Sequence, residues 1–169
     1  MDRDEIIAAL TALGRRLDDQ GVTGDMYVVG GAAIALSFAS RRSTRDVDAV
    51  FEPKMAIYEA AAAVAAERGL PVGWLNDAVK GFLVGDDPLA APALDVPGLR
   101  CMVASPQMLL ALKVLAHRVG EDEDDVRLLA ARLGLTTAQE VLEVAADRMG
   151  DLLGPAARFF VEELFGARP

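Results

Sequence analysis

The sequence contains few residues of the kinds that mark secreted, membrane or disulfide-stabilised proteins. Its only cysteine, Cys101, has no internal partner for a disulfide, which fits a reducing compartment. No apolar run approaches the roughly 18 residues that a membrane helix needs. Residues 1–5 lack the basic and apolar regions of a signal peptide. We therefore expect a cytoplasmic protein without a membrane partner, and an inert, buried Cys101.

Aromatic residues are also scarce, at 5%, and basic residues are outnumbered, so that the formal net charge is −9. Alanine carries much of the apolar content, which favours closely packed helices. The net charge argues against a general nucleic-acid binder, because neutralising phosphates requires lysine and arginine. The charge is uneven, however: Arg41, Arg42 and Arg45 form a short basic cluster, while residues 121–125 are all acidic. A locally positive site on an acidic protein is therefore compatible with the sequence.

The spacing of apolar residues, glycines and prolines predicts strands and helices first, and helices alone afterwards. We expect helices at 4–19, 32–39 and 54–68, strands at 26–29, 46–51 and 98–104, and further helices at 106–118, 122–133, 137–149 and 155–165. The proline-rich residues 71–98 predict irregular structure with a short strand near 82–84. This order favours an α+β fold. We expect a small mixed sheet flanked by helices over 1–104, with a helical extension over 105–169 packed on it as a single compact unit.

Two acidic residues alternate on the predicted strand 46–51. Because side chains of a strand alternate between its faces, Asp46 and Asp48 project from the same face. Two carboxylates so close repel each other, and Mg²⁺, or Mn²⁺ in its place, prefers such oxygen ligands. The alternative is a polar sheet edge whose acids are solvated or paired with nearby arginines. An Asp-x-Asp triplet alone is a weak motif.

A glycine pair precedes these acids. Gly30 and Gly31 follow a predicted strand and begin a predicted helix, where backbone N–H groups and the helix dipole favour phosphate. Glycine also allows the backbone to approach a ligand closely. A lone Gly-Gly would more simply be a tight turn. Together with the Asp-x-Asp strand, it predicts a phosphate-binding turn beside a metal site.

This combination resembles the motif of a known superfamily. Val29-Gly30-Gly31-Ala32, followed by Ser43-Thr44-Arg45-Asp46-Val47-Asp48, is similar to the pattern of DNA polymerase β-like nucleotidyltransferases. There a Gly-Gly or Gly-Ser helix start precedes an Asp-x-Asp strand at a slightly shorter spacing, so we expect a lengthened turn around residues 41–42. The resemblance implies the minimal nucleotidyltransferase core.

The second half of the chain narrows the resemblance to the AbiEii/MenT-type branch. That branch has a helix with Lys-x-x-Ala-x-x-Arg-like spacing and then an Asp-x-x-Asp helix start, similar to Lys113, Ala116, Arg118, Asp122 and Asp125 here. In this sequence the arginine comes two residues after Ala116. The resemblance implies that Lys113 and one of Asp122 or Asp125 belong to the active site. From the residues alone, Lys113 is as well explained as a surface lysine.

These patterns predict Mg²⁺-dependent transfer of a nucleoside monophosphate from a nucleoside triphosphate (NTP), with release of pyrophosphate. Gly30 and Gly31 would hold the β- and γ-phosphates, and Lys113 would offset charge in the transition state. Thr44 is expected on the same strand face as Asp46 and beside the substrate.

The predicted acceptor is a polyanion, guided by Arg41, Arg42 and Arg45. The AbiEii/MenT-type resemblance implies a bacterial toxin that modifies the 3′ end of tRNA and is neutralised by a cognate antitoxin. Two alternatives stay open. The acceptor can be a hydroxyl of a protein or small molecule, or the chain can be a non-catalytic nucleotidyltransferase-like antitoxin or binding module, which its acidic charge favours.

Two further features have less certain roles. Many members of the superfamily carry a third metal-binding carboxylate; Asp95 is the nearest candidate, although its neighbours Pro97 and Gly98 are typical of a turn. Trp74 lies close to Asn76, Asp77 and Lys80. This cluster could line the nucleotide pocket, but a buried tryptophan that anchors an irregular loop is the favoured explanation.

Overall fold

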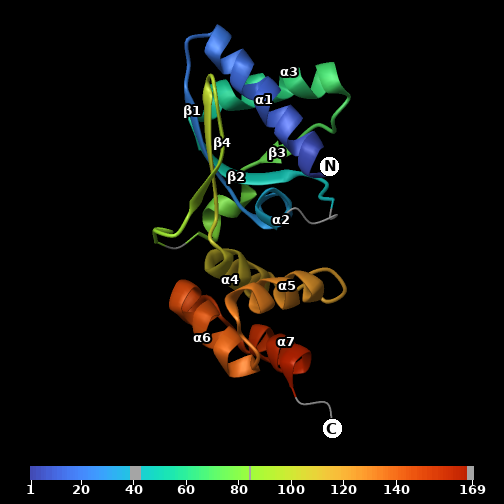
Figure 1. Cartoon of the computed structure of the whole chain (residues 1–169), viewed down its shortest axis with the longest axis vertical. Helices are drawn as coiled ribbons and strands as arrows, with labels where there is room; N and C mark the ends of the chain where they lie inside the picture. The colour runs from blue at the N-terminus through green and yellow to red at the C-terminus, as the bar shows by residue number, and fades with distance from the viewer. Residues whose placement is uncertain (39–42, 84, 167–169) are drawn as a thin grey trace. The chain divides into compact units, whose positions relative to one another are not determined.

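The computed structural model describes residues 1–38, 43–83 and 85–166, so Arg41 and Arg42 lie outside the described residues. The chain divides into two compact units (Figure 1). The first comprises Met1–Leu83 and Leu89–Ala104, and the second comprises Val84–Pro88 and Ser105–Pro169. The expected packing of the two parts into a single unit stays a prediction.

The first unit is built on a five-stranded mixed sheet in the order β3-β2-β1-β5-β4. Its strands are β1 (Gly24–Val28), β2 (Val47–Glu52), β3 (Leu75–Asn76), β4 (Ala91–Val96) and β5 (Leu99–Val103). β1 pairs antiparallel with β2 and parallel with β5, while β3 runs parallel to β2 and β4 antiparallel to β5. The expected α+β class with a mixed sheet is confirmed.

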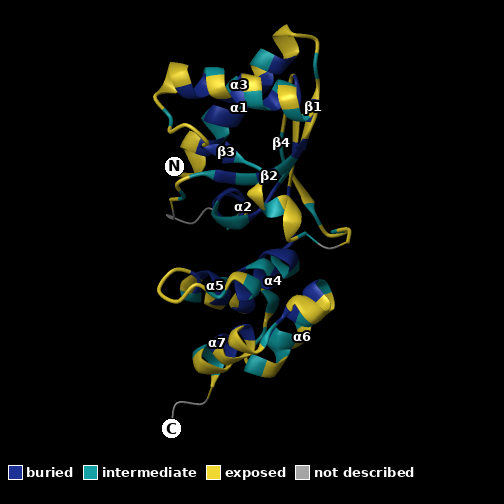
Figure 2. Cartoon of the chain, turned by 180° about the vertical axis from the view of Figure 1, so that it is seen from behind, coloured by how far each residue is buried: buried dark blue, intermediate teal, exposed yellow. Residues whose placement is uncertain are grey.

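Helices α1 (Arg3–Asp19) and α3 (Lys54–Arg68) pack together over one face of this sheet (Figure 1). The strands turn their apolar residues to that face, since Val28, Ala49 and Cys101 are buried. Figure 2 shows the buried residues in dark blue on the inner surfaces of these elements. Burial raises the pKa of the Cys101 thiol to about 12, in agreement with the expected inert cysteine.

Residues 71–98 contain more regular structure than their prolines suggested. They form β3, a 3₁₀ turn η1 (Ala78–Gly81) and β4, whereas the strand expected near 82–84 is wrong for Phe82 and Leu83, which lie outside any strand. β4 contains Pro92 and carries a bulge between Pro92 and Leu94. Because β4 is an edge strand, a residue without a backbone N–H is tolerated there.

The described part of the second unit is helical: α4 (Pro106–Ala116), α5 (Glu123–Leu133), α6 (Ala138–Met149), the 3₁₀ turn η2 (Gly150–Leu152) and α7 (Pro155–Phe165). Ser105 caps α4, and Thr137 with Glu140 forms a capping box on α6. α4 ends two residues earlier than expected, because His117 adopts a left-handed conformation (φ 37°) and its N–H donates to Lys113 O.

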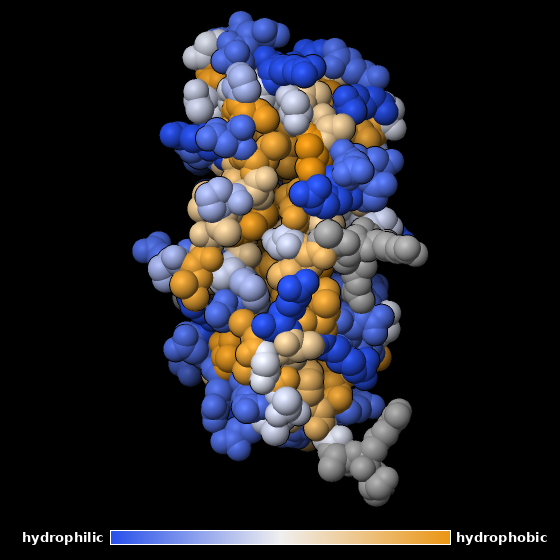
Figure 3. Space-filling model, viewed as in Figure 1, coloured by the Kyte–Doolittle hydropathy of each residue, from blue (hydrophilic) through white to orange (hydrophobic). Residues whose placement is uncertain are grey.

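Among the described residues, no helix combines the length and apolar character needed to cross a membrane. Some large apolar side chains are nevertheless exposed in both units, including Phe82, Met102 and Phe159. The space-filling view in Figure 3 shows hydrophobic atoms, in orange, at the surface among hydrophilic ones.

Candidate functional site

Asp46 and Asp48 lie on the side of β2 opposite to the face that packs against α1 and α3. Along this segment Val47 and Ala49 are buried, while Asp46 and Asp48 are half-buried. The alternation follows from the period of a strand. β2 begins at Val47, one position later than the sequence suggested, so Asp46 is the residue just before the strand.

The glycine pair lies directly against this segment. α2 (Gly30–Phe38) begins at Gly30, and Val29 N–H donates to Asp48 O over 2.9 Å, which joins the helix start to β2. A Cβ at Gly30 would lie 3.0 Å from Asp48 Oδ2. Gly30 also has a φ of +62°, which favours glycine. The Asp48 carboxylate therefore lies beside the first turn of α2.

Thr44 lies against the second glycine. A Cβ at Gly31 would be 3.0 Å from Thr44 Oγ1, and the same hydroxyl donates to Asp46 O over 3.1 Å. Thr44 N–H donates to Met1 O over 2.9 Å. The strand does not extend back to Thr44, which instead belongs to the turn before Asp46. The turn brings the Thr44 hydroxyl to the start of α2.

Asn76 is a polar contact of Asp46 that the sequence analysis did not assign. Its Nδ2 donates to Asp46 Oδ2 over 3.2 Å, and β3 places Asn76 beside Asp48 in parallel register. No local pattern links residues 46 and 76, so the contact is a consequence of the β2–β3 pairing. Trp74 is fully buried and its Nε1 donates to Ala61 O over 3.0 Å, which confirms the expected anchor.

The donor set of this site consists of two carboxylates. Within residues 1–38, 43–83 and 85–166, no group of three or more His, Cys, Asp or Glu side chains is arranged to hold a metal ion. β1 and β5 run parallel, so their beginnings lie at one end of the sheet. Asp95 pairs with Arg100 near the beginning of β5, whereas Asp48 lies beside Val29, just past the end of β1. Asp95 therefore lies at the other end of the sheet from Asp48 and does not complete the set. Two carboxylates still suit Mg²⁺, which commonly binds one or two carboxylates together with substrate phosphates.

The second unit contains a buried ion cluster formed by Lys113, Asp122 and Asp125, which the exposed Arg118 contacts from the surface. Lys113 Nζ lies 2.7 Å from Asp122 Oδ1 and 2.9 Å from Asp125 Oδ2, and the three side chains are 11%, 0% and 9% exposed. Arg118 donates to Asp122 through its backbone N–H and its guanidinium, over 3.0 to 3.1 Å. Asp122 and Asp125, at the start of α5, are therefore paired with basic residues at and just after the end of α4. Lys113 is buried and paired, contrary to the description of a surface lysine.

The charge state of Asp122 follows from this environment. Burial alone would raise the pKa of its carboxyl, but the hydrogen bonds from Arg118 and Lys113 outweigh burial, and the pKa is lowered. Asp122 is therefore ionised at neutral pH. Its contact with Lys113 Nζ holds that ammonium in place.

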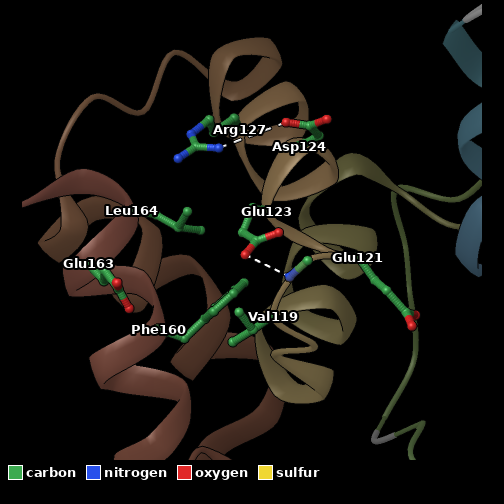
Figure 4. A pocket seen from close by; sticks show the side chains of 9 residues that line it. Val119, Glu121, Glu123, Asp124, Arg127, Phe160, Glu163 and Leu164 are labelled. Atoms are coloured by element: carbon green, nitrogen blue, oxygen red, sulfur yellow. Dashed lines mark hydrogen bonds and ion pairs between the residues drawn. The ribbon is translucent and has the colours of Figure 1, made fainter.

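A surface hollow of ≈ 330 Å³ lies between α5 and α7 of the second unit. Its lining includes Glu121, Glu123 and Glu163, with Phe160 at the base (Figure 4). The excess of acids repels phosphates, so the hollow does not suit a nucleotide. Of the acids at the start of α5, Glu121 and Asp124 are exposed and Glu123 is half-buried.

The remaining predicted residues make fewer contacts. Arg45 is exposed beside Asp46, and Arg41 and Arg42 lie outside the described residues. His117 follows the end of α4, and its Nδ1 lies 2.7 Å from Leu115 O. The basic cluster expected to guide an acceptor stays a prediction.

Comparison with known proteins identifies no relative of this chain. No protein-family model matches it, no curated protein matches it, and no solved structure matches it. The interpretation of the site therefore depends on its residues and their geometry.

Proposed function

We propose that the chain is a Mg²⁺-dependent nucleotidyltransferase whose site lies at Asp46, Asp48, Gly30 and Gly31. The observation that carries the proposal is the contact between the two parts of the motif: the position of a Cβ on Gly30 is 3.0 Å from Asp48 Oδ2. A carboxylate beside the N–H groups of a helix start is suited to hold a cation against an anion that the same helix start binds.

In this reaction a hydroxyl oxygen of the acceptor attacks the α-phosphorus of the NTP. A new P–O bond forms, the bond between the α-phosphorus and its bridging oxygen breaks, pyrophosphate leaves, and the hydroxyl proton passes to water. The first-turn N–H groups of α2 hold the leaving phosphates, because they have no partner within the helix. Asp46 and Asp48 hold the cation, and Thr44 borders the same helix start.

Mg²⁺ at these carboxylates supplies positive charge that polarises the α-phosphate and lowers the pKa of the attacking hydroxyl. The fit is supported by the oxygen donors and by their half-buried position beside the first turn of α2. Lys113, held by Asp122 and Asp125, is proposed to offset charge in the transition state, a role that comes from the AbiEii/MenT-type resemblance.

The proposal is tested by incubating the protein and Mg²⁺ with each of the four labelled NTPs and total RNA or cell lysate. We expect label to be transferred by the wild type and lost with Asp46→Ala and Asp48→Ala. Transfer that persists in both variants would exclude this site. The fraction that gains label identifies the acceptor: RNA supports a toxin that acts on the tRNA 3′ end, whereas protein or a small molecule supports the alternative acceptors.

A non-catalytic binding module is the second candidate, favoured by the net charge of −9. Calorimetry with Mg²⁺ and each NTP separates the candidates. A module with an inactive site is expected to show no heat that depends on Asp46, and a binding partner would then be a cognate toxin or antitoxin.

A further inference from the structure

We propose that Asn76 is a positioning residue of the metal site, which it serves by holding the Asp46 carboxylate in one orientation for the cation. This inference rests on the proposed function. It concerns a residue on β3, thirty positions after Asp46, that the motif of Gly30, Gly31, Asp46 and Asp48 does not include.

The orientation of the Asn76 amide is determined by its two neighbours. Ala78 N–H donates to Asn76 Oδ1 over 3.1 Å, and a backbone N–H can only donate. The amide nitrogen therefore faces Asp46, where Nδ2 donates to Oδ2 over 3.2 Å. Because this bond engages Oδ2, Asp46 would offer its other oxygen, Oδ1, to a cation.

The segment that carries Asn76 is anchored on both sides. Before it, Val47 N–H donates to Trp74 O over 2.6 Å, and the Trp74 ring is buried. After it, Asp77 accepts from the Tyr58 hydroxyl over 2.6 Å and pairs with Lys54, both on α3. Because these contacts restrict the segment, the Asn76 amide can fix the Asp46 carboxylate with little further loss of conformational entropy. Replacing a group that orients a metal ligand in this way commonly weakens metal affinity by about 10- to 100-fold.

The same contacts allow a purely structural explanation, in which Asn76 only shapes the turn into η1. Asn76→Ser separates the two roles. A serine hydroxyl can still accept from Ala78 N–H, as short polar side chains do in such turns, but it is too short to reach Asp46. Asn76→Ala removes both bonds, and Tyr58→Phe loosens the anchor at Asp77 without touching Asn76.

The experiment measures Mg²⁺ affinity by calorimetry in the presence of the α,β-imido analogue of each NTP, and thermal stability of the same samples. We expect Asn76→Ser and Asn76→Ala to weaken Mg²⁺ binding by about tenfold. Asn76→Ser should retain the unfolding midpoint of the wild type. Tyr58→Phe should lower that midpoint but reduce Mg²⁺ affinity by much less than Asn76→Ser does, because Lys54 still pairs with Asp77 and the Asn76–Asp46 bond is retained.

Two results would overturn the inference while the proposed function stands: Asn76→Ser with the Mg²⁺ affinity of the wild type, or Tyr58→Phe with a loss equal to that of Asn76→Ser. If Asp46→Ala binds Mg²⁺ as well as the wild type does, the metal site itself is absent and both proposals fall.

Discussion

Gly30 is the residue at which backbone conformation and the candidate site depend on each other most directly. Its φ of +62° and its approach to Asp48 both require the absence of a Cβ. The sequence alone predicted the need for glycine, because a strand that turns at once into a helix brings backbone close to whatever lies opposite. It did not reveal that the opposing group is the Asp48 carboxylate.

Gly30→Ala is expected to lower stability by about 1–2 kcal/mol through its left-handed conformation and to disturb the Asp48 carboxylate as well. Gly69→Ala is a matched control, since Gly69 has a φ of +65° and nothing within 4 Å of its Cβ position. Denaturant unfolding should give similar losses for both variants. Only Gly30→Ala should reduce Mg²⁺ binding, and an equal reduction in Gly69→Ala would contradict the contact.

Asp122 predicts a specific pH dependence. Its folded-state pKa is lowered, so its ionised form stabilises the protein above the unfolded-state pKa, and that contribution is lost as pH falls through the folded value. Asp122→Asn is therefore expected to lower the free energy of unfolding by about 3 kcal/mol at pH 7. The difference in free energy of unfolding between this variant and the wild type should shrink below about pH 4. Urea unfolding across this range measures it, and a difference independent of pH would refute the assignment.

At the level of elements, helices were predicted best, since their apolar spacing, caps and terminal glycines are local signals. Ser105 and Gly134, for example, mark a start and an end that the structure retains. β3 and β4 could not be predicted. β3 has only two residues and depends on pairing with β2, and β4 contains a proline that only an edge strand accepts.

The α4–α5 pair depends on the buried cluster around Lys113. Lys113→Met leaves Asp122 and Asp125 in a buried position without their ammonium, and breaking such a pair costs about 3–5 kcal/mol. Arg16→Met is the comparison, because the Arg16–Glu67 pair joins α1 to α3 at an exposed position and should contribute about 1 kcal/mol or less.

Urea unfolding of these two variants tests the difference. If Lys113→Met is as stable as Arg16→Met, the cluster does not hold α4 and α5 together. The proposed role of Lys113 in the transition state is tested separately, by measuring transfer activity under conditions in which Lys113→Met stays folded.

For the whole molecule, the net charge of −9 makes RNA an unfavourable partner unless the basic cluster contributes locally. If Arg41, Arg42 and Arg45 contact three phosphates of an RNA acceptor, log(1/KM) for RNA should fall with log salt concentration with a slope of about −2. The triple alanine variant should flatten that slope and leave KM for the NTP unchanged. A slope near zero in the wild type would favour a protein or small-molecule acceptor.

Several features of this protein follow from neighbouring residues alone. The period of a strand sets the alternation that buries Val47 and leaves Asp46 and Asp48 half-buried. The conformation of a tight turn accounts for the glycines at the start of α2. Such features depend on residues a few positions apart, so the chain encodes them directly. They are the reason that a resemblance to the nucleotidyltransferase motif could be proposed from the sequence alone.

The contacts between distant segments needed the folded chain. Strand pairing brings Asn76 to Asp46 and Gly30 to Asp48, and it moves Asp95 to the far end of the sheet. The register of two strands is chosen by how the whole apolar face packs, here against α1 and α3, and not by the residues that meet on the opposite face. The ligand set of the candidate site is therefore a consequence of core packing.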